Sequence, residues 1–243
     1  MIMSKLSNAP LVEVVFELRW PIENRSDLSG FQYLHGDLYA ELKSKYPVRE
    51  QIAAPDIPLE ALINRAVHRF RTEKDAYPLF QVGPGVLTLN TIDNNYYWED
   101  FYDRSDELLD TFKNVNPFKE ETKFSPSLLY FDFFPFDFDN NDVMDFMNKN
   151  FNLKIQQDFF NKGRQNGISL GLDFQRSAGN LTIQFSKGHN PDQQEGIVMQ
   201  TRLHGKMINF SKTDLLKWLD DAHEICSDTF KQLTKNKIYE SFK

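Results

Sequence analysis

The residue pair that comes closest to a reactive site is His223 with Cys226, three positions apart in the segment LDDAHEICSD. On a helix, residues at this spacing are neighbours, so the imidazole could act as the base that a thiolate nucleophile needs. However, Cys226 follows Ile225 on the apolar side of an amphipathic pattern, where a lone cysteine is typically a small core residue. We therefore predict that the pair is structural, with His223 forming a hydrogen bond that ties its helix to a sheet.

Other patterns that carry chemistry are missing from the sequence. Structural zinc needs four Cys or His ligands, whereas this chain has one cysteine and no CxxC or HxxxH motif near His223. The segment Gly83-Pro84-Gly85 lacks the spacing and the Lys-Ser/Thr ending of a phosphate loop. No nucleophile elbow, EF-hand loop or HExxH motif is present. The sequence thus predicts no catalytic residue, no metal ligand and no cofactor, and it favours binding over catalysis.

The only compact basic group is RAVHRFR, residues 65–71. On a strand, Arg65, Arg69 and Arg71 would share one face. Three guanidinium groups on one face could hold a phosphate, a nucleotide or an acidic partner segment. The alternative is that they pair with carboxylates of this protein on a solvated sheet face. We retain Arg65, Arg69 and Arg71 as candidates for binding a small anionic ligand.

An aromatic segment, SLLYFDFF (127–134), raises a different question. On an alternating strand, Tyr130 and Phe134 share one face, and Phe131 and Phe133 share the other. Such a strand is either covered on both sides or reserved for a partner. Tyr130, Phe131, Phe133 and Phe134 are therefore candidate partner-binding residues, with burial of both faces as the alternative. Exposed aromatic residues among acidic ones suit a protein partner, or a second copy of this chain, better than an anionic polymer.

Hydrophobic periodicity predicts the elements that position these residues. In the first half we expect a strand over 11–20, a helix that begins near Ser29 and ends before Pro47, an irregular segment over 48–62, a strand over 63–73, a hairpin over 79–92 turning at Gly83–Gly85, and a helix over 97–114.

The second half repeats this order of elements without repeating the residues. We expect a strand over 127–134, a short helix that begins at Asn140 or Asn141 and reaches Phe151, strands over 168–174, 181–186 and 197–203, and a long helix from about 212 with Ser211 as its cap. The predicted class is α+β: an antiparallel sheet with helices mainly on one face. We predict a single domain, 1–243, in which 1–120 and 121–243 could be pseudo-symmetric halves.

Composition limits the classes of function. The net charge of −7 and the pI of about 5.3 argue against a general nucleic-acid binder. The start, MIMSKLSNAP, lacks the apolar core of a signal peptide, and no apolar run approaches the ~20 residues that span a bilayer. We therefore expect a cytoplasmic protein without a membrane partner. The 22 phenylalanines supply ample material for a core and for an interface.

Three segments carry a resemblance to a known family: LSNAPLVEVVFELRWP, VGPGVLTLN with YYWEDF after it, and LDDAHEICSDTFKQLT. They resemble a sporadically distributed, uncharacterised bacterial and archaeal family of about this length. Its opening Asn-Ala-Pro, Glu and Arg correspond to Asn8, Ala9, Pro10, Glu13 and Arg19, and its closing Ala-His and Phe to Ala222, His223 and Phe230. The chain departs from the family at Leu129, where members tend to carry arginine. The resemblance implies no activity, but the family's patchy distribution implies a link to bacterial defence or mobile elements.

Two functions of different class follow. The first is a non-enzymatic protein-binding or regulatory module that binds another protein or a second copy of this chain. It would be an accessory protein of a defence or mobile-element system. The alternative is a sensor that binds a small anionic ligand in a pocket between sheet and helices.

Overall fold

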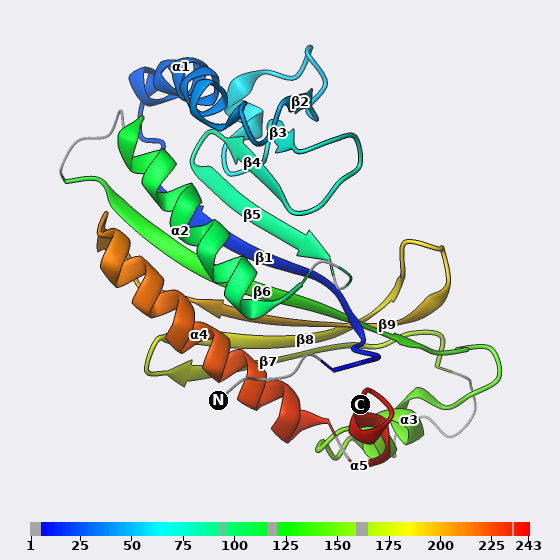
Figure 1. The fold of residues 1–243 in the computed structure, drawn as a ribbon. Helices are drawn as coiled ribbons and strands as arrows, with labels where there is room; N and C mark the ends of the chain where they lie inside the picture. The colour runs from blue at the N-terminus through cyan, green and yellow to red at the C-terminus, as the bar shows by residue number, and fades with distance from the viewer. Residues whose placement is uncertain (1–5, 93, 95, 116–120, 159–164, 235) are drawn as a thin grey trace.

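The structure is a computed structural model, and it describes residues 6–92, 94, 96–115, 121–158, 165–234 and 236–243. It combines helices with a large antiparallel sheet (Figure 1), which confirms the predicted α+β class. In chain order the elements are β1 (Leu11–Arg19), α1 (Arg25–Leu42), β2 (Val48–Gln51), the 3-10 helix η1 (Leu59–Leu62), β3 (His68–Arg71), β4 (Leu79–Gly83), β5 (Val86–Ile92), α2 (Trp98–Asn114), β6 (Lys123–Pro135), α3 (Val143–Asn150), β7 (Ser169–Arg176), β8 (Gly179–His189), β9 (Glu195–His204), β10 (Ile208–Asn209), α4 (Lys212–Leu233) and α5 (Asn236–Glu240).

Within the described ranges, the strands form one ten-stranded sheet in the order β2-β3-β4-β5-β1-β6-β9-β8-β7, with β10 also paired to β6. The two long central strands, β1 and β6, run antiparallel, with Val14 opposite Tyr130 and Phe16 opposite Leu128. The register shifts between Leu11 and Glu13, so the strand pair is irregular where β1 begins. Strands from the early and late parts of the chain therefore meet along β1 and β6 in one continuous sheet.

Alternation along β1 gives the sheet two unlike faces. Val14, Phe16 and Leu18 are 0–1% exposed, whereas Glu17 and Arg19 on the other side keep contact with solvent. Helix α1 packs against β3 and β4, α2 against β5, and α4 against β6 and β9. We call the side of Phe16 the core face and the side of Glu17 the Glu17 face.

Helix α1 begins earlier than the apolar pattern predicted. Its N-cap is Asn24, not Ser29, and the Asn24 side chain accepts hydrogen bonds from the backbone N–H groups of Ser26 and Asp27. The Asp27 carboxylate accepts in return from the Asn24 backbone N–H, which completes a capping box. The first turn is polar apart from Leu28, so the pattern did not reveal it.

The segment over 48–62 is more regular than expected, because it contains β2 and η1. The strand predicted over 63–73 is shorter, since only His68–Arg71 pair in the sheet and Arg65 lies before them. The hairpin is as predicted: β4 and β5 pair around a turn in which Gly85 has φ +81°. A Cβ at Gly85 would also stand 2.8 Å from the Trp20 carbonyl oxygen, so glycine is required there.

Most of the later elements lie close to their predicted bounds, but β6 begins at Lys123, four residues before the predicted strand, and β10 and α5 were not predicted. Helix α3 is capped by Asp142, whose side chain accepts from the Asp145 backbone N–H, and not by Asn140 or Asn141. At the start of α4, the Ser211 hydroxyl accepts from the Asp214 N–H, as the sequence predicted. None of the helices that the structure describes is both long enough and apolar enough to cross a bilayer.

Candidate functional site

A cavity of about 700 Å³ lies at one end of the core face. Its floor comes from β6 and β9, and its walls come from the segment before β1, the start of α2, the second half of α4, and the C-terminal residues around α5. Figure 1 shows α4 running down to this region, where the segment leading into β1 and the C-terminus also lie. We call this cavity the α4 pocket. Its aromatic lining consists of Tyr96, Tyr97, Trp98, Tyr130, Phe230 and Tyr239.

Three polar side chains form a connected group in the α4 pocket. The Tyr130 hydroxyl lies 2.7 Å from Nδ1 of His223 and 2.9 Å from the Tyr96 hydroxyl. These contacts join β6 to α4 and to the residues before α2, so they confirm the predicted hydrogen bond between His223 and the sheet. The His223 ring also stacks on Trp98, with ring centroids 3.7 Å apart and planes 9° apart.

Burial fixes the charge state of this group. It lowers the pKa of His223 to about 4, with a smaller effect from the Lys231 charge. The imidazole is therefore neutral near pH 7, and its Nδ1 can accept the proton of Tyr130. Burial also raises the pKa of Tyr96 above its usual range, so both tyrosines keep their protons.

Asp132 is the most unusual residue in the α4 pocket. The residue is only 5% exposed, and among the described residues its carboxyl has no hydrogen bond and no ion pair. Burial alone raises the pKa of Asp132 to about 7. Thr201, which lies opposite Tyr130 on β9, is 2% exposed, and its hydroxyl is buried without a partner in the described part of the chain. Both residues thus line the same cavity without a side-chain partner in the described ranges, and buried polar groups without a partner are rare in folded proteins.

Cys226 lines the α4 pocket too, but its thiol is poorly suited to attack. Burial, together with the nearby Asp132 carboxyl, raises the pKa of Cys226 to about 12. A thiolate nucleophile needs a lowered pKa and a free base, whereas the Nδ1 of His223 contacts Tyr130. The geometry therefore offers a place to bind a molecule and no nucleophile–base pair.

We expect Cys226 to react with an aromatic disulfide reagent at least about a hundredfold more slowly in the native protein than in the unfolded chain. The residue is 2% exposed, and the reactive thiolate is scarce at pH 8. Absorbance of the released thiol, followed with and without denaturant, measures both rates. Equal rates in the two conditions would show that the Cys226 thiol is not buried, and the hypothesis that Cys226 is a nucleophile would then have to be tested again.

The candidate arginines lie far from the α4 pocket lining, on and beside β3. Arg71 is 4% exposed, and it donates to Glu50 and to the Ala76 carbonyl, both at 3.1 Å. Arg69 lies 3.8 Å from the same Glu50 carboxylate. Arg65 is exposed and precedes the strand. The strand thus brings Arg69 and Arg71 together around one carboxylate and leaves Arg65 apart. Anion binding by the three arginines stays a prediction.

The four candidate aromatic residues of β6 divide between two environments. Phe134 and Phe133 are buried, at 3% and 7% exposure. On the Glu17 face, Phe133 lies over Gly196 of β9, where an added Cβ would stand 2.5 Å from its ring. Tyr130 and Phe131 are partly exposed, and Tyr130 lines the α4 pocket. Their use as a partner-binding surface stays a prediction.

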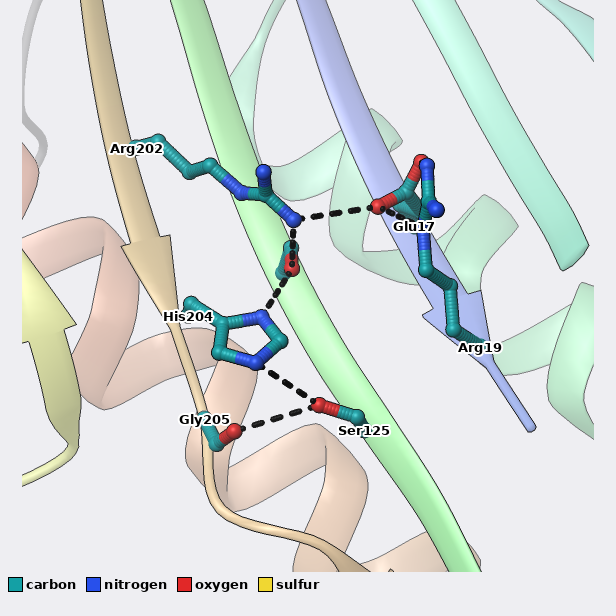
Figure 2. Close-up of polar contacts among 7 residues, drawn as sticks. Glu17, Arg19, Ser125, Arg202, His204 and Gly205 are labelled. Carbon is teal, nitrogen blue, oxygen red and sulfur yellow. Dashed lines mark hydrogen bonds and ion pairs between the residues drawn. The ribbon is translucent and has the colours of Figure 1, made fainter. Parts of the chain in front are cut away.

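A second polar cluster crosses the Glu17 face (Figure 2). The Glu17 carboxylate accepts from Arg19 at 2.7 and 2.9 Å and from Arg202 at 3.5 Å. Arg202 also donates to the Ser127 hydroxyl, which lies 2.9 Å from Nδ1 of His204. These bonds connect β1, β6 and β9 across the centre of the sheet.

The hydrogen-bond chain continues from His204 along the same face. Its Nε2 lies 3.2 Å from the Ser125 hydroxyl, which donates to the Gly205 carbonyl. A Ser–His contact can signal a nucleophile, but Ser127 is 0% exposed and Ser125 is 7% exposed. A hollow of about 520 Å³ lies beside His204, and in its lining Asp173 accepts a hydrogen bond from Thr182 at 2.6 Å. This cluster therefore joins β1, β6 and β9. Within the described residues the Arg202 Nε is buried without a hydrogen-bond partner, although the other end of the same guanidinium is bonded to Glu17 and Ser127.

Sequence reasoning missed Asp132 and Thr201 as site residues. Asp132 could have been found, because strand alternation places it on the face of Leu128 and Phe134, both of which are apolar and buried. An ionisable residue in such a row is a signal of function. Thr201 gave no comparable signal, since threonine is common in strands.

Metal-binding groups and similarity to known proteins also bear on identity. In the part of the chain that the structure describes, no group of three or more His, Cys, Asp or Glu side chains is arranged to hold a metal ion. Comparison of the sequence with protein-family models, with curated proteins and with solved structures found no match.

Proposed function

We propose that this protein is a small-molecule binding protein, a sensor rather than an enzyme, and that its ligand occupies the α4 pocket. The observation that carries the proposal is that Asp132 and Thr201, two buried polar residues, lie on the floor of one cavity and have no side-chain partner among the described residues. Ligand sites are typically cavities of about 300–1,000 Å³ with mostly apolar walls and a few polar groups. The α4 pocket fits this description in size and in its aromatic lining.

The position of the α4 pocket suits a sensor. Its walls come from four segments that are distant in sequence: the residues before β1, the start of α2, α4 and α5. A ligand that contacts all four would stabilise their arrangement, since binding to the folded state alone stabilises that state. A second protein could then distinguish the filled form from the empty one.

Ligand binding is tested by blocking the α4 pocket. Ser227 lines the pocket on α4, and replacing it with tryptophan should fill part of the cavity. Glu224→Trp is the matched control, because Glu224 is exposed on the same helix and does not line the cavity. A metabolite library is screened by thermal denaturation, where a ligand at a hundred times its Kd stabilises by about 2.7 kcal/mol. We expect hits to stabilise wild type and Glu224→Trp but not Ser227→Trp. Hits that stabilise all three proteins equally would place the site elsewhere.

We also propose that the chain is built from two related halves, with helices mainly on one face of the sheet. The strand order supports this, because β1 and β6, the first strand of each half, lie side by side in the centre of the sheet. Outwards from β1 the order is β5, β4, β3 and β2, and outwards from β6 it is β9, β8 and β7. Each half also carries a long helix after its strands, α2 or α4, and these two helices contact each other. Figure 1 draws α1, α2 and α4 along the same side of the strands. The α4 pocket then lies where elements of both halves meet.

The protein-binding role predicted from sequence stays a second proposal. Phe131, on the Glu17 face of the central strand β6, is the observation that favours it, because a partly exposed phenylalanine there could contact another protein or a second copy. A cytoplasmic location and a link to bacterial defence stay predictions that rest on sequence and on family resemblance.

A further inference from the structure

We propose that the α4 pocket selects an organic cation: a molecule with a protonated amine that reaches Asp132 and an aromatic or apolar body that lies against the pocket walls. This inference rests on the proposed small-molecule function and names the chemistry of its ligand. It departs from the anionic ligand that the basic segment suggested, because Arg65, Arg69 and Arg71 do not line this cavity.

The first reason for a cationic ligand is the carboxyl of Asp132. An ionised carboxylate that is buried without a hydrogen bond or counter-charge is costly, and a cation of the ligand would remove this cost. The neighbouring polar groups do not serve as that cation: Thr201 and Cys226 are neutral, and His223 is neutral near pH 7 because burial lowers its pKa. A protonated amine donates several hydrogen bonds, and the Thr201 hydroxyl, which has no partner among the described residues, is a second acceptor in the lining of the same cavity.

The second reason for a cationic ligand is the aromatic lining of the α4 pocket. Six aromatic side chains line the cavity, from the start of α2, from β6, from α4 and from α5. Aromatic rings attract cations through the negative charge over their faces, and they also bury apolar surface of a ligand. A carboxylate among aromatic walls is the chemistry that recognises alkylammonium groups, whereas a bound anion would meet the buried carboxylate as a like charge.

Other charged groups that line the cavity do not change this preference. Lys231 lies 4.0 Å from the Asp228 carboxylate, and Lys243 lies 2.7 Å from that of Glu240. Both lysine side chains are about half exposed, at 44% and 54%, so they belong to the solvent side of the cavity. Glu99 is exposed as well. Among the described residues that line the cavity, Asp132 is thus the buried acidic side chain.

The test compares matched ligands of three charges. The probes are arylalkylamines, such as tryptamine, each with the neutral alcohol and the carboxylate of the same ring system. Saturation-transfer NMR at millimolar ligand measures Kd for the wild type, for Asp132→Asn and for Ser227→Trp. We expect amines to bind the wild type at least about tenfold more tightly than their alcohols at pH 8. We expect Asp132→Asn to abolish this difference while the alcohols still bind.

A pH series adds a second readout. If the amine binds the ionised carboxyl, its affinity for the wild type should rise about tenfold from pH 6 to pH 8, because the pKa of Asp132 in the empty pocket is about 7. Asp132→Asn should show no such rise.

The outcomes separate the two proposals. Alcohols or carboxylates that bind as well as amines, and that Ser227→Trp excludes, would keep the binding function and overturn the cation preference. Amines whose preference survives in Asp132→Asn would also overturn it. If no member of the three classes binds the wild type, the cation inference is contradicted. The small-molecule function is contradicted only if the metabolite library also gives no ligand that Ser227→Trp excludes.

Discussion

Replacing Phe134 with serine is expected to lower the free energy of unfolding by at least about 3 kcal/mol. Truncating a packed phenylalanine to alanine costs about 3–5 kcal/mol, and serine adds a hydroxyl that must be buried. Phe134 is 3% exposed, and its ring centroid lies 5.1 Å from that of Phe151 and 6.2 Å from that of Phe242. Denaturant unfolding followed by circular dichroism gives the free energy of each variant.

Phe131→Ser is the matched control on the same strand. Phe131 is partly exposed on the Glu17 face, so its loss should destabilise the protein clearly less than the loss of Phe134. Sedimentation velocity on both variants reports association. If Phe131 belongs to a contact surface, its variant should associate more weakly while keeping most of its stability. Equal destabilisation by the two substitutions, with association unchanged, would contradict a partner-binding role for Phe131.

The sequence predicted the sheet where strand alternation is strong. β1, β8 and β9 follow their patterns, because one side of each carries residues that the core buries. The β4–β5 hairpin and β7 were also predicted, although β5 is buried on both sides and β7 has no fully buried residue. The cap of α4 was also predictable, since Ser211 and Asp214 make a local hydrogen bond that needs no tertiary contact.

Local patterns failed where tertiary contacts decide the structure. β2 reads VREQ, which has little strand character, and it forms because its backbone pairs with β3. The early start of α1 depends on a reciprocal bond between Asn24 and Asp27, and the apolar pattern does not include either residue.

The α4 pocket was the least predictable feature, for a physical reason. Alternation places Asp132 on the core face, but it cannot show whether a partner reaches the carboxyl. That depends on Leu6, Tyr96 and Tyr239, which come from distant parts of the chain and close the cavity around β6. The sequence identified His223 and its tie to the sheet, but it gave no sign that Tyr130 would be its partner.

The difference in the free energy of unfolding between Asp132→Asn and the wild type is expected to shift in favour of the variant as the pH rises. Folding raises the pKa of Asp132 from 3.8 to about 7, because burial disfavours the charged form. The folded state therefore keeps a proton that the unfolded chain releases. The stability that this proton contributes is complete below pH 3.8 and is lost as the pH rises through 7. Since one pKa unit corresponds to 1.36 kcal/mol, the wild type should lose about 2–3 kcal/mol between pH 5 and pH 8 through this residue.

The titration of His223 changes the free energy of unfolding with pH in the opposite direction, so its contribution must be separated from that of Asp132. Folding lowers the pKa of His223 from 6.5 to about 4, so its contribution to stability is complete above pH 6.5 and is lost as the pH falls toward 4. Asp132→Asn keeps His223, so the difference between the two proteins isolates Asp132. Unfolding by denaturant at pH 5 and at pH 8 measures it, with Asp192→Asn, at an exposed position, as control. Asp132→Asn should gain about 2–3 kcal/mol on wild type over this range, and Asp192→Asn should gain nothing. If the free energy of unfolding changes by the same amount between pH 5 and pH 8 in all three proteins, the Asp132 carboxyl is solvated or paired. Both the unpartnered carboxyl and the cation site proposed on it would then be wrong.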